Sequence, residues 1–268
     1  MTCQIKLIEE IGNKNEEVEQ LNLDDIIFKQ IDTDTAKDML LNYHYLQRIP
    51  SISVVYGAYH DKRLVGVLTI GKPASHSLCK GVCGEKWASH VYELNRIYTL
   101  DDTPKNLESK FIGHVLKDIK KRNWILISYA DNSMNHSGYI YQATNWLYTG
   151  TTKQRTDIYI GKNSHSRHYN SEQQQFVIRQ VRPSKHRYIY LCGDKKFKKQ
   201  VLADLRYLII EEYPKGNVGH YDVGEGQEKI LYHKIRKEYF KESDFLNNTK
   251  KYLTESELKE YNRLYENN

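Results

Sequence analysis

A carboxylate, an amide and a guanidinium follow one another in a strand-like segment, where they could accept a proton and hold a ligand. In Glu93-Leu94-Asn95-Arg96, the period of two expected for a strand places Glu93 and Asn95 on one face and Leu94 and Arg96 on the other. An apolar strand seldom carries such groups unless they are paired or used in a site. A structural Glu93–Arg96 ion pair is the alternative, and the string alone leaves both interpretations open.

A second carboxylate ends the next expected strand, in Ser128-Tyr129-Ala130-Asp131. Ligands of open α/β sheets gather at the carboxyl ends of strands, so Asp131 is a candidate proton acceptor. The alternative is a cap for the turn or helix that follows.

The polar run from His136 to Asn145 comes next. If it is helical, Tyr141 and Asn145 share a face, and Gly138 permits close approach by a ligand or a neighbouring backbone. Core packing alone would not select this many amides and hydroxyls, so the run is a candidate ligand-binding segment.

The histidine and cysteine pattern gives weaker signals. His44, in Tyr43-His44-Tyr45, is a candidate base or metal ligand, although a lone histidine is more often structural or exposed. The spacing His76-x2-Cys79-x3-Cys83 resembles part of a metal site but lacks a clear fourth ligand. The sequence contains no Gly-x-Ser-x-Gly elbow, no Ser-His-Asp order and no P-loop.

The elements that must position these residues alternate between strands and helices. We expect a helix at 33–45 capped by Thr35, a hairpin of strands 54–59 and 64–70, a loop at 71–89, a strand at 91–98, a helix at 105–121 and a buried strand at 124–129. A short helix at 137–145, strands at 146–149 and 157–160, and a second β–α unit at 186–192 and 195–210 follow. This order predicts a mixed α/β sheet, mostly antiparallel and flanked by helices.

Three parts are expected along the chain. Residues 1–32 form an N-terminal segment, residues 33–215 the catalytic domain, and residues 216–268 a charged helical extension. The capping box Thr254-Glu255-Ser256-Glu257 opens the terminal helix of that extension.

Composition excludes several classes of protein. The 268 residues include 39% hydrophobic and 28% charged residues and only four cysteines. No apolar run approaches membrane-spanning length, no signal peptide opens the chain, and the cysteines are too few for a disulfide framework. We therefore expect a cytoplasmic protein with no membrane partner.

The positive charge is unevenly distributed. Lys and Arg outnumber Asp and Glu by 40 to 34, and residues 179–215 alone hold ten basic residues against four acidic ones. Such a block suits a polyanion, because each neutralised phosphate releases counterions, although a solubilising surface is the alternative. The expected phosphate contacts of such a polyanion, which would be DNA contacts if the polyanion is DNA, are Arg182, Lys185, Arg187, Lys195, Lys196, Lys198 and Lys199.

The element order resembles the GNAT acyltransferase fold, in which the strands before and after the main helix splay apart around an acyl donor. The donor fingerprint of that fold, Arg/Gln-x-x-Gly-x-Gly/Ala, is absent. Pro104-Lys105-Asn106-Leu107-Glu108-Ser109 stands in its place, where helix N-terminal amides could still bind phosphate.

Over residues 40–215 the motifs together resemble the bacteriophage Mom family of DNA-modification proteins. The matching strings are Tyr43-His44-Tyr45, the hairpin ending at Gly71, Glu93-Leu94-Asn95-Arg96, Ser128-Tyr129-Ala130-Asp131, the run 136–145 with Tyr148 and Gly150, Lys185-His186-Arg187-Tyr188, and Tyr213-Pro214-Lys215. The resemblance implies a GNAT-like enzyme that adds a carbamoylmethyl (acetamido) group to the exocyclic amine of adenine in double-stranded DNA and so shields phage DNA from restriction. It also raises iron as a candidate cofactor, to be tested at His44, Tyr129, Asp131 and His136.

The chemistry of adenine suggests roles for these residues. Its exocyclic amine is a poor nucleophile, so a positioned group must take its proton while the electrophile is polarised. The expected catalytic residues are Asp131, Glu93, Tyr141 and Ser128. The expected substrate-binding residues are Asn95, Arg96, Tyr129, His136, Asn145, Tyr148, His44 and Tyr45. We expect the adenine to flip into a pocket lined by tyrosines.

Two other functions remain open from the sequence. A general GNAT N-acyltransferase, acting on a protein or small-molecule amine, would bind coenzyme A tightly and would not need the basic block. A non-catalytic DNA-binding protein would bind in a salt-sensitive way without chemistry. The small-molecule acyl donor, for which acetyl-CoA is a candidate, and the oligomeric state stay undefined.

Overall fold

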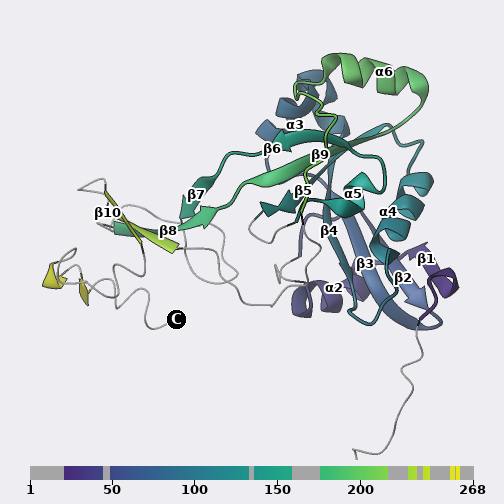
Figure 1. Cartoon of the computed structure of the whole chain (residues 1–268), viewed down its shortest axis with the longest axis horizontal. Helices are drawn as coiled ribbons and strands as arrows, with labels where there is room; N and C mark the ends of the chain where they lie inside the picture. The colour runs from purple at the N-terminus through teal and green to yellow at the C-terminus, as the bar shows by residue number, and fades with distance from the viewer. Residues whose placement is uncertain are drawn as a thin grey trace, which may run out of the picture.

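A seven-stranded sheet forms the centre of the molecule (Figure 1). The computed structural model describes residues 21–44, 49–132, 136–158, 176–216, 229–233, 238–241, 254–256 and 258–259. The strands lie in the order β1 (Ile26–Gln30), β2 (Val54–His60), β3 (Arg63–Gly71), β4 (Val91–Thr99), β5 (Trp124–Asp131), β9 (Lys185–Cys192) and β6 (Leu147–Thr151). Only the β4–β5 pair is parallel, which confirms the predicted mixed, mostly antiparallel sheet.

The parallel pair opens after a short stretch. Pairing runs only from Val91↔Ile125 to Glu93↔Ile127, although β4 continues to Thr99 and β5 to Asp131. The two central strands therefore diverge at their carboxyl ends, as expected for a sheet that holds a ligand between them.

Helices cover both faces of the sheet. The helical elements are η1 (Leu23–Asp25), α2 (Thr33–Asn42), α3 (His76–Cys83), η2 (Glu85–His90), α4 (Leu107–Asp118), α5 (Tyr139–Gln142) and α6 (Lys195–Asp204). On one face, called the α4 face, residues of α4 and α5 pack on Leu94, Leu126 and Tyr188. On the other, called the α3 face, α3, η2 and α6 pack on Ile125, Ile127 and Ile189, and α2 packs on Val55 and Val67.

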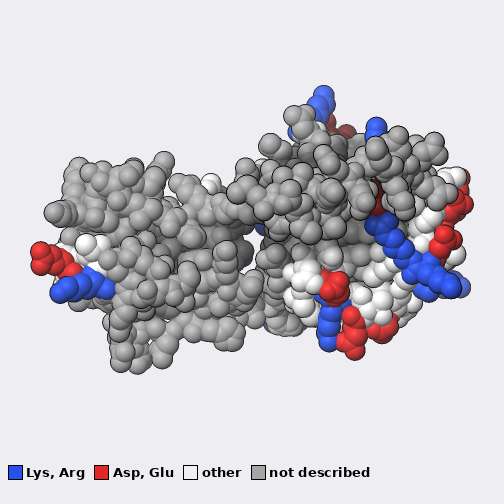
Figure 2. All heavy atoms as spheres, turned by 90° about the horizontal axis from the view of Figure 1, so that it is seen from below, with Lys and Arg blue, Asp and Glu red and all other residues white. Residues whose placement is uncertain are grey.

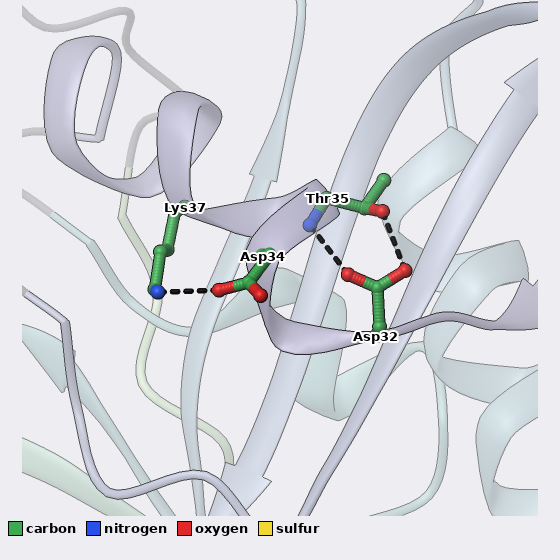
Figure 3. A network of polar contacts seen from close by, with 4 residues as sticks. All are labelled: Asp32, Asp34, Thr35 and Lys37. Atoms are coloured by element: carbon green, nitrogen blue, oxygen red, sulfur yellow. Dashed lines mark hydrogen bonds and ion pairs between the residues drawn. The ribbon is translucent and has the colours of Figure 1, made fainter.

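The start of α2 is set by an acidic cap (Figure 3). The Asp32 carboxylate accepts hydrogen bonds from the backbone N–H of Thr35 at 2.8 Å and from its hydroxyl at 2.7 Å. The cap is therefore Asp32 and not the predicted Thr35, and Lys37 pairs with Asp34 one turn later. This cap fixes the helix whose far end carries His44.

A β-bulge in β4 changes which residues share a face. The register shifts between Thr69↔Arg96 and Ile70↔Leu94, so Asn95 is an extra residue opposite Thr69. Arg96 consequently faces the α3 side together with Thr69, and the prediction that it shares the face of Leu94 is wrong.

A second sheet stands away from the first (Figure 1). Its strands lie in the order β11 (Glu238–Lys241), β10 (Lys229–His233), β8 (Phe176–Arg182) and β7 (Arg155–Ile158). The extension at 216–268 thus contributes two strands, and residues 255–256 and 258–259 in it are helical. The segment 71–89, predicted as a loop, contains α3 and η2. None of the described helices combines the length and apolar character that crossing a bilayer requires.

Candidate functional site

Four of the predicted site residues line the α3 face where β4 and β5 diverge. Glu93 and Asn95 come from β4, and Tyr129 and Asp131 from β5, where alternate positions share a face. The Asn95 amide is already engaged: its oxygen accepts from the Thr69 hydroxyl at 2.6 Å, and its nitrogen donates to the Ser51 carbonyl at 2.8 Å. Asn95 therefore holds the rim of the site together.

A paired carboxylate and a histidine lie at the open end of β5. Asp131 is only 5% exposed, and its carboxylate lies 2.7 Å from the Lys185 ammonium on β9. The backbone N–H of His136 donates to the Asp131 carbonyl at 3.2 Å. Burial lowers the pKa of His136, while Asp131 acts in the opposite direction. The imidazole is therefore neutral near pH 7, and a nearby carboxylate stabilises its charged form.

Arg187 contributes to the same face. It lies opposite Tyr129 in the β5–β9 register, its guanidinium donates to the Thr149 hydroxyl at 2.9 Å and carbonyl at 2.7 Å, and it stacks 3.4 Å from the Tyr207 ring centre. Burial, and then the charge of Glu93, raise the pKa of the Tyr129 phenol, so the phenol stays protonated. Arg187 and Lys185 were predicted as DNA contacts, but the structure engages both with neighbouring side chains.

Other predicted residues lie on the opposite, α4 face. Ser128 Oγ lies 2.8 Å from both the Leu94 carbonyl oxygen and the Tyr141 hydroxyl. Since a hydroxyl has one proton, Ser128 donates to the carbonyl and accepts from Tyr141. This chain of hydroxyls links β4 to β5 beyond their last paired residues. Tyr148, also on this face, contacts His186 Nδ1 through its hydroxyl at 2.9 Å.

Asn145 does not join this group. Helix α5 ends at Gln142, and Asn145 is exposed with a φ of 60°, a turn conformation that asparagine tolerates. The prediction that it shares a helix face with Tyr141 is wrong. Tyr45 lies outside the described residues.

Ser137, which follows His136 in the chain, lines a cavity of about 550 Å³. The cavity is lined by Ser137, Tyr139, Gln142, Glu212, Tyr213, Pro214, Lys215 and Gly216. The Gln142 amide nitrogen donates to the carbonyls of Ser137 and Pro214, both at 3.1 Å, which leaves its oxygen as an acceptor. Gly138 has a φ of 80°, and a Cβ there would lie 2.4 Å from the Tyr188 ring, so close approach by a side chain explains this glycine.

The segment 205–216, here called the strap, joins the two faces. The Arg206 N–H donates to the Val82 carbonyl on α3, and the Ile210 N–H donates to the Tyr148 carbonyl on β6, both at 2.9 Å. The Tyr213 hydroxyl then donates to the Trp146 carbonyl at 2.8 Å. The strap therefore passes around β6 and supplies Tyr207 to the α3 face and Tyr213 to the cavity. The motif Tyr213-Pro214-Lys215 was a sequence signal for this part, and Tyr139 lies in the run 136–145 that was expected to bind a ligand, whereas Tyr207 had no signal.

His44 is buried, 4% exposed, at the end of α2. Burial, and then the positive charge of Arg96, lower its pKa to about 3. His44 is therefore neutral, and it lies beside the β4 bulge.

We expect this burial to make folding pH-dependent. The folded pKa lies below the unfolded value of 6.5, so the contribution of His44 is fully present above pH 6.5 and is lost as pH falls toward 3. Between pH 6.5 and pH 5 the loss is about 2 kcal/mol at 1.36 kcal/mol per pH unit. Urea unfolding at both pH values should show a smaller difference for His44→Gln than for the wild type. Equal differences would contradict a neutral, buried His44.

The described side chains do not form a metal centre. No three His, Cys, Asp or Glu side chains gather in the described part of the chain, so the iron site considered at His44, Tyr129, Asp131 and His136 is not supported. On α3, burial raises the pKa of the Cys83 thiol to about 12, which keeps it protonated and a poor metal ligand.

The predicted basic block does not form one surface. Lys195, Lys196 and Lys199 are exposed on α6 and Lys198 is half-buried there, while Lys185 and Arg187 lie in the site. On the face seen from below, the described basic side chains lie among acidic ones and form no patch of one sign (Figure 2).

Comparisons of the amino-acid sequence find a matching family and a curated relative. A model of the Mom protein family matches residues 25–215. Methylcarbamoylase mom of Escherichia phage Mu is 31% identical over 121 residues, which are 43% of this chain and 50% of that protein. The chain thus spans about half the length of the curated relative that it matches.

Solved structures of acetyltransferases are also similar at low identity. An N-acetyltransferase from Staphylococcus aureus Mu50 gives a TM-score of 0.39 at 11% identity, covering 62% of this chain and 97% of that one. A GNAT family acetyltransferase from Elizabethkingia anophelis with acetyl-CoA bound gives 0.38 at 14% identity, covering 63% and 99%. The fold assignment rests on the strand order of the sheet itself.

Proposed function

The chain belongs to the Mom protein family, and from this premise we propose that it is a transferase that modifies adenine in DNA. The added group is small and acyl-derived, of the carbamoylmethyl or acetamido type, and the acceptor is the exocyclic amine. The name of the phage Mu relative, a methylcarbamoylase, supports a group of this kind. Protection of phage DNA from host restriction would follow from the modification.

The observation that carries the proposal is the row Lys185–Asp131–His136, from which the chain continues directly into a tyrosine-lined cavity at Ser137. Lys185 holds the Asp131 carboxylate at 2.7 Å, Asp131 lies near His136, and the cavity begins at Ser137. A planar base can stack against Tyr139 and Tyr213, which are 55% and 39% exposed. The Gln142 amide oxygen can accept a hydrogen bond from a base N–H.

Proton transfer then assigns the roles in this row. The adenine amine attacks the electrophilic carbon of the donor, a new N–C bond forms, and the bond from that carbon to the leaving group breaks. His136, neutral before the step, takes the proton of the amine, and Asp131 stabilises the resulting imidazolium. Glu93, which was the alternative acceptor, lies near Tyr129 on the same face.

We place the donor between the diverging ends of β4 and β5, beside the Ser128–Tyr141 link. Coenzyme A would bring its pyrophosphate to the start of α4, where Asn106 is left-handed and makes no side-chain cap. The segment before α4 carries Asp101, Asp102 and Lys105, Asp102 is paired with Arg63 at 2.7 Å, and Lys110 is paired with Asp24. These mixed charges do not select a pyrophosphate, so the donor is proposed only as an activated small molecule that carries the group.

Nucleoside mass spectrometry tests the proposal directly. DNA from bacteria that express the folded protein should yield a heavier deoxyadenosine nucleoside and should resist nucleases that cut at adenine-containing sites. Cells with the empty vector provide the control. Unaltered nucleosides beside acylated host proteins or amines would favour a general N-acyltransferase, and unaltered nucleosides beside salt-sensitive DNA binding would favour a non-catalytic binder.

A further inference from the structure

The four strands of the second sheet hold five basic and two acidic residues, and the longer stretches of sequence in which these strands occur are also basic. Residues 153–182 contain six basic and two acidic residues, and residues 229–241 contain five basic and one acidic. Together they carry +8, whereas the entire chain carries +6, so the remaining residues carry −2. A concentration of one sign in 43 residues is the composition expected of a phosphate-binding element.

The second sheet also lies next to the end of β5 at which Asp131 is found. In the β5–β9 register Asp131 is opposite Lys185, and β8 ends at Arg182, only three residues earlier. Three residues span at most about 11 Å. The second sheet therefore begins next to the open end of β5, from which it projects away from the main sheet (Figure 1).

The lysines of α6 lie near the opposite end of β5. Trp124, the first residue of β5, is opposite Cys192, and α6 begins at Lys195 just beyond. The seven residue steps from Trp124 to Asp131 amount to about 24 Å at the rise of an extended strand. A duplex whose adenine reaches the Asp131 end would meet the second sheet before it met α6.

We infer that the second sheet, made of β7, β8, β10 and β11, is a DNA-binding arm that holds the phosphates of the duplex beside the site. The inference rests on the proposed function, from which it takes duplex DNA as the binding partner. It moves the main DNA contact from α6 to strands that include β10 and β11, which lie beyond the matched residues 25–215.

Matched charge removal in the arm and on α6 tests this inference. The arm variant carries Arg155→Gln, Arg182→Gln and Lys229→Gln, which the strand registers place on one face of the second sheet. The control carries Lys195→Gln, Lys196→Gln and Lys199→Gln, so both variants lose three positive charges. Binding to a 20-base-pair duplex is measured as a function of salt. The arm variant should reduce the slope of log K against log salt by about 3 and weaken binding at least about tenfold at 0.1 M salt. The control should stay close to the wild type.

The outcomes separate the arm from the chemistry. DNA binding can be measured without the donor, so it is tested independently of the reaction. If the nucleosides are unaltered but the arm variant alone loses DNA binding, the proposed reaction is overturned and the DNA-binding arm is supported. Modified adenine together with wild-type binding in the arm variant would overturn the arm and support the reaction. Equal losses in both variants, loss only in the α6 variant, or no duplex binding by the wild type would each overturn the arm. Arg182→Gln alone should reduce the slope by about 1.

Discussion

Replacing His136 with asparagine is expected to lower the rate of adenine modification by about 10²- to 10⁴-fold, the usual contribution of a positioned acid or base. Asparagine keeps a polar side chain of similar size but cannot take the proton of the amine. The rate is measured from the fraction of modified deoxyadenosine over time in DNA from expressing cells.

The pH profile gives a second readout. The pKa of His136 is lowered from 6.5, so the neutral, active form of the wild type persists as pH falls to 6.5 and declines only below that value. The residual activity of His136→Asn should lack this acidic limb. A purely structural role would leave the limb in place.

His114→Asn is the matched control. His114 is exposed on α4 and packs beside Phe28 of β1, an edge strand that β2, β3 and β4 separate from β5. Its replacement should leave the rate and the pH profile unchanged. Comparable losses in the two variants would remove His136 from the mechanism.

Much of the main sheet could be predicted because its strands carry their own signals. The β2–β3 hairpin and the apolar β5 were expected from β-branched runs, and α4 from its helical period. The boundaries that were missed depend on contacts between distant segments. Helix α6, for example, was expected to reach residue 210 but ends at Asp204, because the next residues instead bond to α3 and β6.

The site was harder to predict for the same reason. Strict alternation along β4 placed Arg96 on the wrong face, because the bulge at Asn95 is held by Thr69 and Ser51, which are distant in sequence. Asp131 was identified from its place at a strand end. Its partner Lys185 was taken for a DNA contact, because only the β5–β9 register reveals the pairing.

That pairing leads to a strong effect on stability. Lys185→Met should destabilise the fold by about 3 kcal/mol, because it leaves the Asp131 carboxylate, 5% exposed, without its ammonium partner. Urea unfolding at pH 7 measures the change. Lys80→Met removes an exposed partner of Glu85 at the same 2.7 Å and should change the unfolding midpoint little.

The double variant Asp131→Asn/Lys185→Met separates stability from chemistry. Removing both charges should restore most of the lost stability, because no buried charge is left alone. Modification should nevertheless stay low, because an amide cannot stabilise the His136 imidazolium as a carboxylate does. If the double variant recovered both stability and modification, Asp131 would be a structural residue, and the row that ends at His136 would no longer explain the reaction.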